Sequence, residues 1–276
     1  MKLTTKIIIG IILSIFIIPI LLIISFSFTD RVNSRKFNSL PDISQETMQK
    51  KEVTPYKVIS LDVEPMKYFY LTGSLQIRPA KSEDERNKIL LPQDLSDIFS
   101  FHTSGDTLII NMDANESFYQ KYYGDEKRNE RILRQLPGFN LTAYTTQSVD
   151  VVSNSGGIQI DIRDIDTDHI KVNTRSDIRM ENCKSNTVEP LVVDAYNKSV
   201  HFKDCKINEL NIDLDFMNNW SIGNCDTKVE NLTGSRDYTE AHFRKTDANE
   251  VNWYPKNEKA RLNLNLYDGA VKVVYQ

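Results

Sequence analysis

Apolar and polar residues alternate along most of the chain, and this two-residue period predicts short β-strands. Four segments repeat at intervals of 22, 20 and 21 residues with apolar first and third positions: IRMENCK (178–184), VHFKDCK (200–206), WSIGNCD (220–226) and AHFRKTD (241–247). IQIDIRD (158–164) begins 20 residues before the first of them. A period of about 20 residues predicts an all-β parallel solenoid, in which stacked coils of about 20–22 residues share one core.

Two sets of apolar pairs mark the strands of each expected coil. The first set occupies the first and third positions of the copies: Ile158/Ile160, Ile178/Met180, Val200/Phe202, Trp220/Ile222 and Ala241/Phe243. A second, looser set falls between the copies: Ile170/Val172, Leu191/Val193, Leu210/Ile212, Val229/Leu232 and Val251/Trp253.

All three cysteines occur in the repeat, each directly after an Asn or Asp, as Asn182-Cys183, Asp204-Cys205 and Asn224-Cys225. Asn and Asp tolerate the left-handed conformation that a tight corner requires. We therefore expect the cysteines to point inward beyond the corner and to stack as small apolar residues. A zinc site lacks paired spacings and a fourth ligand, whereas a disulfide between adjacent copies stays an alternative.

The N-terminal segment has a different character. Residues 7–24 carry no charge and would form a helix about 27 Å long, enough to cross a membrane. We expect an uncleaved signal-anchor over residues 1–29 that contacts the membrane through residues 7–28, with a cleaved signal peptide as the alternative. A polar linker over residues 30–55 and an exported solenoid domain over residues 56–276 would follow.

Charge excludes one class of partner. The chain has 34 basic and 38 acidic residues, and residues 1–29 hold two of the bases and none of the acids. The remainder is therefore mildly acidic, at about −6, and no basic stripe points to nucleic acid.

Acidic residues offer the only hints of chemistry. Asp213 and Asp215 face out of one strand together, a spacing that could suit glycoside cleavage, although no basic partner is evident. The acidic stretch 161–169 lacks the Gly and Glu positions of a calcium loop. We assign no catalytic, cofactor-binding or metal-binding residues, and expect no cofactor. Tyr238, Trp253, Tyr254 and Tyr267 are the candidate ligand contacts.

The order of these features resembles the head GIN domain family, adhesin-like domains of bacterial envelope proteins. The matching segments are VISLDVEPMKYFYLTGSLQIRPA, SGDTLIINM and SVDVVSNSGGIQIDI, after an N-terminal export segment. The resemblance, over about residues 56–274, implies a right-handed parallel β-helix without catalytic residues. This chain departs from the family in having few Ser-Gly pairs at its corners and an N-terminal membrane helix.

These observations favour a non-enzymatic, membrane-anchored, single-pass envelope protein on the periplasmic or extracellular side. Its solenoid would serve as a binding, adhesion or scaffolding surface for an envelope protein or a glycan. A polysaccharide-acting β-helix enzyme, a lyase or hydrolase, is the alternative. The sequence identifies neither the partner nor the oligomeric state.

Overall fold

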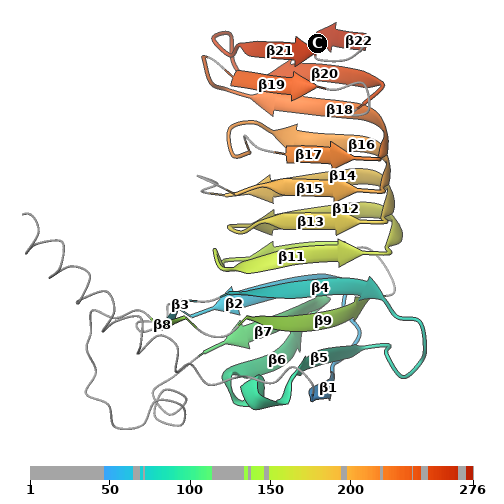
Figure 1. Ribbon diagram of the computed structural model, residues 1–276, viewed down its shortest axis with the longest axis vertical. Coiled ribbons are helices and arrows are strands. Elements are labelled where there is room, and N and C mark those ends of the chain that lie inside the picture. Colours follow the sequence, from blue (N-terminus) through green and yellow to red (C-terminus); the bar gives the residue numbers. More distant parts are fainter. Residues whose placement is uncertain are drawn as a thin grey trace, which may run out of the picture. The chain divides into compact units, whose positions relative to one another are not determined.

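The computed structural model (Figure 1) describes part of the chain. The described residues are 47–64, 69–70, 72–113, 134–135, 138–145, 149–193, 198–217, 220–237, 239–243, 248–266 and 272–275. The chain divides into two compact units, Met1–Pro41 and Asp42–Gln276, and every described residue belongs to the second. The apolar segment 7–28 lies outside the described residues.

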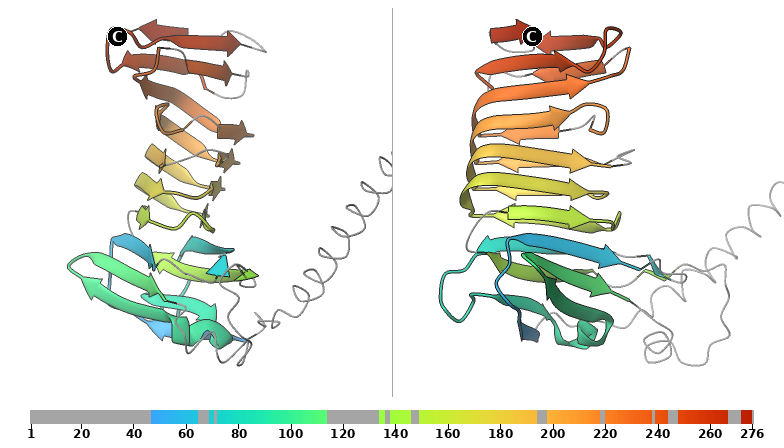
Figure 2. Two further views of the ribbon diagram at one scale, coloured as in Figure 1. Left: turned by 90° about the vertical axis from the view of Figure 1, so that its left-hand side faces the viewer. Right: turned by 180° about the vertical axis from the view of Figure 1, so that it is seen from behind.

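Nearly all described secondary structure is β, arranged in two large sheets (Figure 2). The eight-stranded sheet runs in the order β1 (Met48–Glu52), β5 (Lys88–Pro92), β9 (Phe139–Thr145), β4 (Gly73–Pro79), β11 (Ile158–Arg163), β13 (Ile178–Glu181), β15 (Val200–Lys203) and β17 (Trp220–Gly223). The ten-stranded sheet runs in the order β22 (Lys272–Tyr275), β20 (Glu250–Pro255), β18 (Asp226–Gly234), β16 (Lys206–Asp213), β14 (Lys184–Val192), β12 (Asp166–Thr174), β10 (Val149–Ser153), β2 (Val58–Val63), β7 (Thr107–Met112) and β6 (Phe99–Ser104).

Three smaller features complete the described part. Two parallel two-stranded sheets pair β19 (Thr239–Phe243) with β21 (Leu262–Leu266) and β3 (Phe69–Tyr70) with β8 (Arg134–Gln135). A 3-10 helix, η1 (Gln93–Ile98), buries Leu95 and Ile98.

In residues 149–255, which we call the parallel stack, the strands from β10 to β18 alternate between the two large sheets. Strand β19 then pairs with β21 in a separate two-stranded sheet, and β20 returns to the ten-stranded sheet. Every strand pair here is parallel and in register, as in Ile160↔Ile178 and Ile178↔Val200. Figure 2 shows the two sheets facing each other along the stack, and buried apolar residues from both sheets belong to one core cluster.

The corners of the parallel stack follow the sequence prediction. Asn182, Asp204 and Asn224 have φ of 55°, 53° and 53°, and Asp164 at the equivalent place has φ of 58°. The amide of Asn182 donates to Asp164 at 2.7 Å, and Asn224 donates to Asp204 in the same way. The corner residues are thus tied to one another across the strands.

The first set of apolar pairs is buried in the copies that begin at 158, 178 and 200, and half-buried in the copy that begins at 220. The side chains of the copy at 241 lie outside the described residues. In the second set, Leu191, Val193 and Val229 are not in the core; they are half-buried. The inward positions belong instead to Val188, Val192 and Glu230, the last of which is 0% exposed between Leu210 and Val251.

Residues 47–145, which we call the mixed region, pair differently. Strands β1 and β5, β5 and β9, and β6 and β7 are antiparallel, while β2 with β7 and β4 with β9 are parallel. Gly105, with φ of 58°, forms the tight turn between β6 and β7. A short turn of this kind returns the chain beside itself in the opposite direction, which is an antiparallel hairpin.

The expected right-handed parallel β-helix of uniform coils is therefore wrong. The protein is all-β, but both large sheets are mixed, and the described residues form no closed solenoid. The reason is local: the 20-residue period begins near residue 158, and the segments before it carry hairpin turns instead of corners.

The expected N-terminal transmembrane helix is likewise not seen. Among the described residues no helix is long and apolar enough to span a membrane. Strand β1 lies inside the range 30–55 that was expected to be a linker, where it pairs with β5.

Candidate ligand-binding groove

A row of polar side chains crosses the outer face of the ten-stranded sheet. Asn211, Asn231 and Asn252 occupy the same position on β16, β18 and β20. The Asn252 amide donates to Asn231 at 3.0 Å, and Asn231 donates to Asn211 at 2.8 Å. The Asn211 amide reaches Glu189 at 3.5 Å, and Lys171 Nζ lies 3.6 Å from the same carboxylate. We call Asn211, Asn231 and Asn252 the amide row.

A second row of outward side chains runs beside the first. Asp213 on β16 is aligned with Thr233 on β18, and Thr233 is aligned with Tyr254 on β20. Asn211 and Asn231 of the amide row and all three residues of the second row line a groove of about 430 Å³, whereas Asn252 is buried and supports Asn231. The lining of the groove comprises Lys171, Glu189, Pro190, Leu191, Asn211, Ile212, Asp213, Asn231, Thr233 and Tyr254.

Leu191 belongs to this groove because of the register of β14. Val188, Pro190 and Val192 are buried, so the residue between the last two faces outward. The sequence pattern had grouped Leu191 with the apolar pairs of the expected coils. Its actual position adds to the apolar surface that Pro190 and Ile212 contribute to the groove.

Asp213 and Asp215, at the end of β16, share a single cation. Lys256 Nζ lies 2.6 Å from an Asp213 carboxylate oxygen and 3.0 Å from Asp215, and it also lies 5.8 Å from the ring centroid of Phe216. Burial alone would raise the pKa of Asp215, but the Ser235 N–H and Lys256 hold that pKa below its ordinary value. The two carboxylates therefore share one positive charge.

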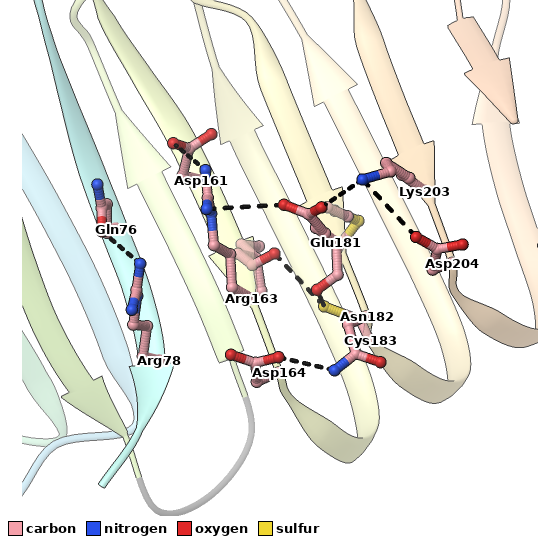
Figure 3. A network of polar contacts seen from close by, with 12 residues as sticks. Gln76, Arg78, Asp161, Arg163, Asp164, Glu181, Asn182, Cys183, Lys203 and Asp204 are labelled. Atoms are coloured by element: carbon pink, nitrogen blue, oxygen red, sulfur yellow. Dashed lines mark hydrogen bonds and ion pairs between the residues drawn. The ribbon is translucent and has the colours of Figure 1, made fainter. Parts of the chain in front are cut away.

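The outer face of the eight-stranded sheet carries an ion-pair network. Figure 3 shows Arg163 between Asp161 and Glu181, at 3.5 Å and 3.6 Å. Lys203 binds Glu181 at 2.7 Å and approaches Asp204 at 3.8 Å. The hydrogen bond from Lys203 lowers the pKa of Glu181. Each acid of the network has a cation beside it, which favours a role in tying neighbouring strands together.

The acidic stretch 161–169 is paired across strands rather than gathered around an ion. Asp166 binds Lys184 at 3.0 Å, and Asp168 accepts a hydrogen bond from Asn186 at 2.7 Å. Within the described ranges, no group of three or more His, Cys, Asp or Glu side chains is placed to hold a metal ion.

The cysteines stack at the inner side of the corners, as the repeat predicts. Cys183 and Cys205 are buried, Cys225 is half-buried, and all three are free thiols. The backbone N–H of Cys205 donates to Cys225 Sγ at 3.3 Å. Contact with Cys205 and burial raise the pKa of the Cys183 and Cys225 thiols. No disulfide links them.

The four predicted ligand contacts have different positions. Tyr254 is half-buried and lines the groove. Trp253 is 3% exposed and packs inside the stack. Its ring lies against Gly234, so closely that a Cβ atom added at Gly234 would be only 3.1 Å from it. Tyr238 and Tyr267 lie outside the described residues. Sequence reasoning missed the amide row and Lys256, although Asn211, Asn231 and Asn252 recur at the period of the repeat.

Comparison with known proteins finds distant structural likenesses. No protein-family model matches the sequence, and no curated protein matches it. A crystal structure of a "putative adhesin" from Bacteroides fragilis shares 9% identity at a TM-score of 0.43, covering 84% of this chain and 98% of that chain. A "putative adhesin" from Parabacteroides merdae shares 10% identity at a TM-score of 0.31, covering 83% and 95%. A "putative lipid binding protein" from Parabacteroides distasonis shares 10% identity at a TM-score of 0.32, covering 83% and 96%. Such distant likenesses transfer no function to this chain.

Proposed function

We propose that this protein is a non-enzymatic binding protein whose ligand contacts the groove on the outer face of the ten-stranded sheet. The amide row is the observation that carries the proposal. Its side chains are held in line by hydrogen bonds of 2.8 and 3.0 Å, so their polar groups are positioned before a ligand arrives. Positioned polar groups reduce the side-chain ordering that binding requires.

The arrangement of Asp213 and Asp215 argues against the alternative of a polysaccharide-cleaving enzyme. Glycoside hydrolysis uses one protonated and one ionised carboxyl group on opposite sides of the bond to be broken. Here both carboxylates bind the same Lys256 ammonium, and the lowered pKa of Asp215 keeps that group ionised. Neither is therefore suited to act as the general acid.

We expect the protein to act outside the cytoplasm. The expectation rests on the uncharged apolar segment 7–24, which has the length and composition of an export segment.

The proposal is tested by filling the groove. Asn231→Arg places a long cation in the middle of the groove, whereas Ser221→Arg places the same side chain on the exposed outer face of β17, in the other sheet. The full-length protein, purified in detergent, is measured for binding to cell-envelope material from the source organism. We expect Asn231→Arg to abolish binding and Ser221→Arg to leave it unchanged, with thermal unfolding checked for both. Equal binding by both variants would overturn the proposal.

A further inference from the structure

We propose that the groove takes a neutral, extended glycan chain that lies across strands β12 to β20. This inference rests on the proposed function, namely that the groove is the ligand surface, and it adds the chemical class of the ligand. Four features of the groove support it: its length, its hydrogen-bonding capacity, its apolar contacts and its charge.

The length of the groove suits a short stretch of polymer. Its lining residues come from β12, β14, β16, β18 and β20, which are successive neighbours in the sheet. Neighbouring strands lie about 4.8 Å apart, so five strands span about 19 Å. The strand spacing is close to the length of one sugar residue in an extended β-linked chain. A chain of about four residues would therefore meet the same side-chain position once per sugar.

The amide row has hydrogen-bonding capacity left for a ligand. A primary amide has two N–H donors and an oxygen with two lone pairs. Within the row, Asn231 uses one N–H to reach Asn211 and one lone pair to accept from Asn252. One donor and one acceptor of Asn231 remain beyond these bonds. Sugar hydroxyls both donate and accept, so they match this pair.

The opposite side of the groove offers apolar contacts beside polar ones. Tyr254 has an aromatic body with a polar tip, and such a ring can lie against the C–H face of a sugar while its hydroxyl bonds the ligand. Leu191 on β14 supplies a second apolar contact, two strands away from Thr233 on β18 in the ten-stranded sheet. Together they would hold a chain that the amide row orients.

Charge favours a neutral glycan over an acidic one. Lys171 is paired with Glu189 at 3.6 Å, and Asp213 is paired with Lys256 at 2.6 Å. Lys256 also binds Asp215, so both cations are taken up by carboxylates and the groove offers no excess positive charge to an anionic polymer. A protein partner is less suited, because the cores of protein interfaces are enriched in aromatic residues, Met and Arg. The described lining of the groove includes one aromatic residue, Tyr254, and neither Met nor Arg.

The test uses β-1,4-linked glucose oligosaccharides of two to six residues as probes and measures their binding to the full-length protein by calorimetry. We expect the affinity to rise about tenfold or more between two and four residues and then to level off, because the groove ends after about 19 Å. Asn231→Ala and Tyr254→Leu should each weaken binding about tenfold, while Ser221→Ala should not change it.

Several outcomes would overturn the glycan inference: no dependence on chain length, preference for an acidic galacturonate oligosaccharide, or loss of envelope binding after protease treatment of the envelope material. The last would indicate a protein partner. If any of these occurs while Asn231→Arg still abolishes envelope binding, the groove remains the ligand surface and only its ligand class is wrong. If Asn231→Arg leaves envelope binding intact, the proposed function itself fails.

Discussion

The parallel stack and the mixed region use strands of similar length, but they differ in what their sequences repeat. In the parallel stack each strand meets the equivalent strand of the next copy in register, so equivalent side chains form rows both inside and outside. In the mixed region strands from distant segments meet, as when β4 pairs with β9 and β11. The comparison explains why the amide row and the groove lie in the stack: repetition in the sequence is what aligns identical side chains on a surface.

The largest expected effect comes from placing a charge inside each region. Phe202 in β15 is 2% exposed, and Phe202→Asp should cost at least about 4 kcal/mol, because it removes a buried ring and buries a carboxylate. Phe101 lies half-buried on the edge strand β6, so Phe101→Asp should cost only about 1–2 kcal/mol. Urea unfolding of both variants measures the difference. Equal losses would show that the stack core is no more tightly enclosed than the edge of the mixed region.

The next largest loss of stability is expected at asparagines in the left-handed backbone conformation. Asn182 in the stack and Asn87 in the mixed region both have φ of 55°. Asn182→Ala should cost about 2 kcal/mol, from the left-handed backbone and the lost bond to Asp164. Asn87→Ala should cost about 1 kcal/mol, from the backbone alone. Asn182→Gly serves as the control, since it relieves the backbone and should cost about 1 kcal/mol for the amide bond. No loss of stability for Asn182→Gly would mean that the hydrogen bond between Asn182 and Asp164 contributes nothing to folding.

Lys256→Met should give a smaller, pH-dependent loss of at most about 1 kcal/mol, because the Lys256 side chain is 37% exposed and water screens the pair. The folded-state pKa of Asp215 is lowered, so its contribution is fully present above its unfolded pKa of about 4 and disappears as the pH falls through the folded value. Unfolding curves of both proteins should therefore converge in strong acid. Lys50→Met, at an exposed pair with Asp84 in the mixed region, should change stability less. A Lys256→Met penalty that persists unchanged in strong acid would rule out this ion pair as its source.

Thiol labelling probes the enclosure of the stack without changing its stability. Cys183 and Cys205 should react only after unfolding, and Cys225 slowly, because burial and its raised pKa keep that thiol protonated. Ser100→Cys, on the exposed side of β6, should react at once. Mass spectrometry of timed reactions gives each rate. Rapid labelling of Cys183 in the folded protein would show that the corners open readily.

The sequence predicted the repeating part of the fold more fully than the rest. The period near 20 residues indicated parallel in-register strands, and Asn182, Asp204 and Asn224 indicated left-handed corners followed by inward cysteines. The mixed region was not predicted, because a hairpin such as that at Gly105 and the pairing of β1 with β5 depend on contacts between segments without a shared period.

The candidate site was predicted only in part. Tyr254 was identified. Trp253 was named both in the apolar pair Val251/Trp253 and among the ligand contacts, and its burial beside Val251 agrees with the pair and not with the contact. In β14 the apolar pairing was off by one residue, which exchanges the two faces of a strand and places Leu191 outward. Lys256 lies one residue beyond β20, and its ion pairs with Asp213 and Asp215 depend on how β20 is placed relative to β16.

The most direct test of the central claim is to locate the ligand on the surface of the full-length protein. A diazirine-bearing residue is introduced at Leu191, in the groove, or at Ser221, on the outer face of the other large sheet, and each protein is irradiated with cell-envelope material. We predict covalent capture of carbohydrate from position 191 and none from position 221. Equal capture from both positions, or capture from position 221 alone, would contradict the assignment of the groove as the binding surface.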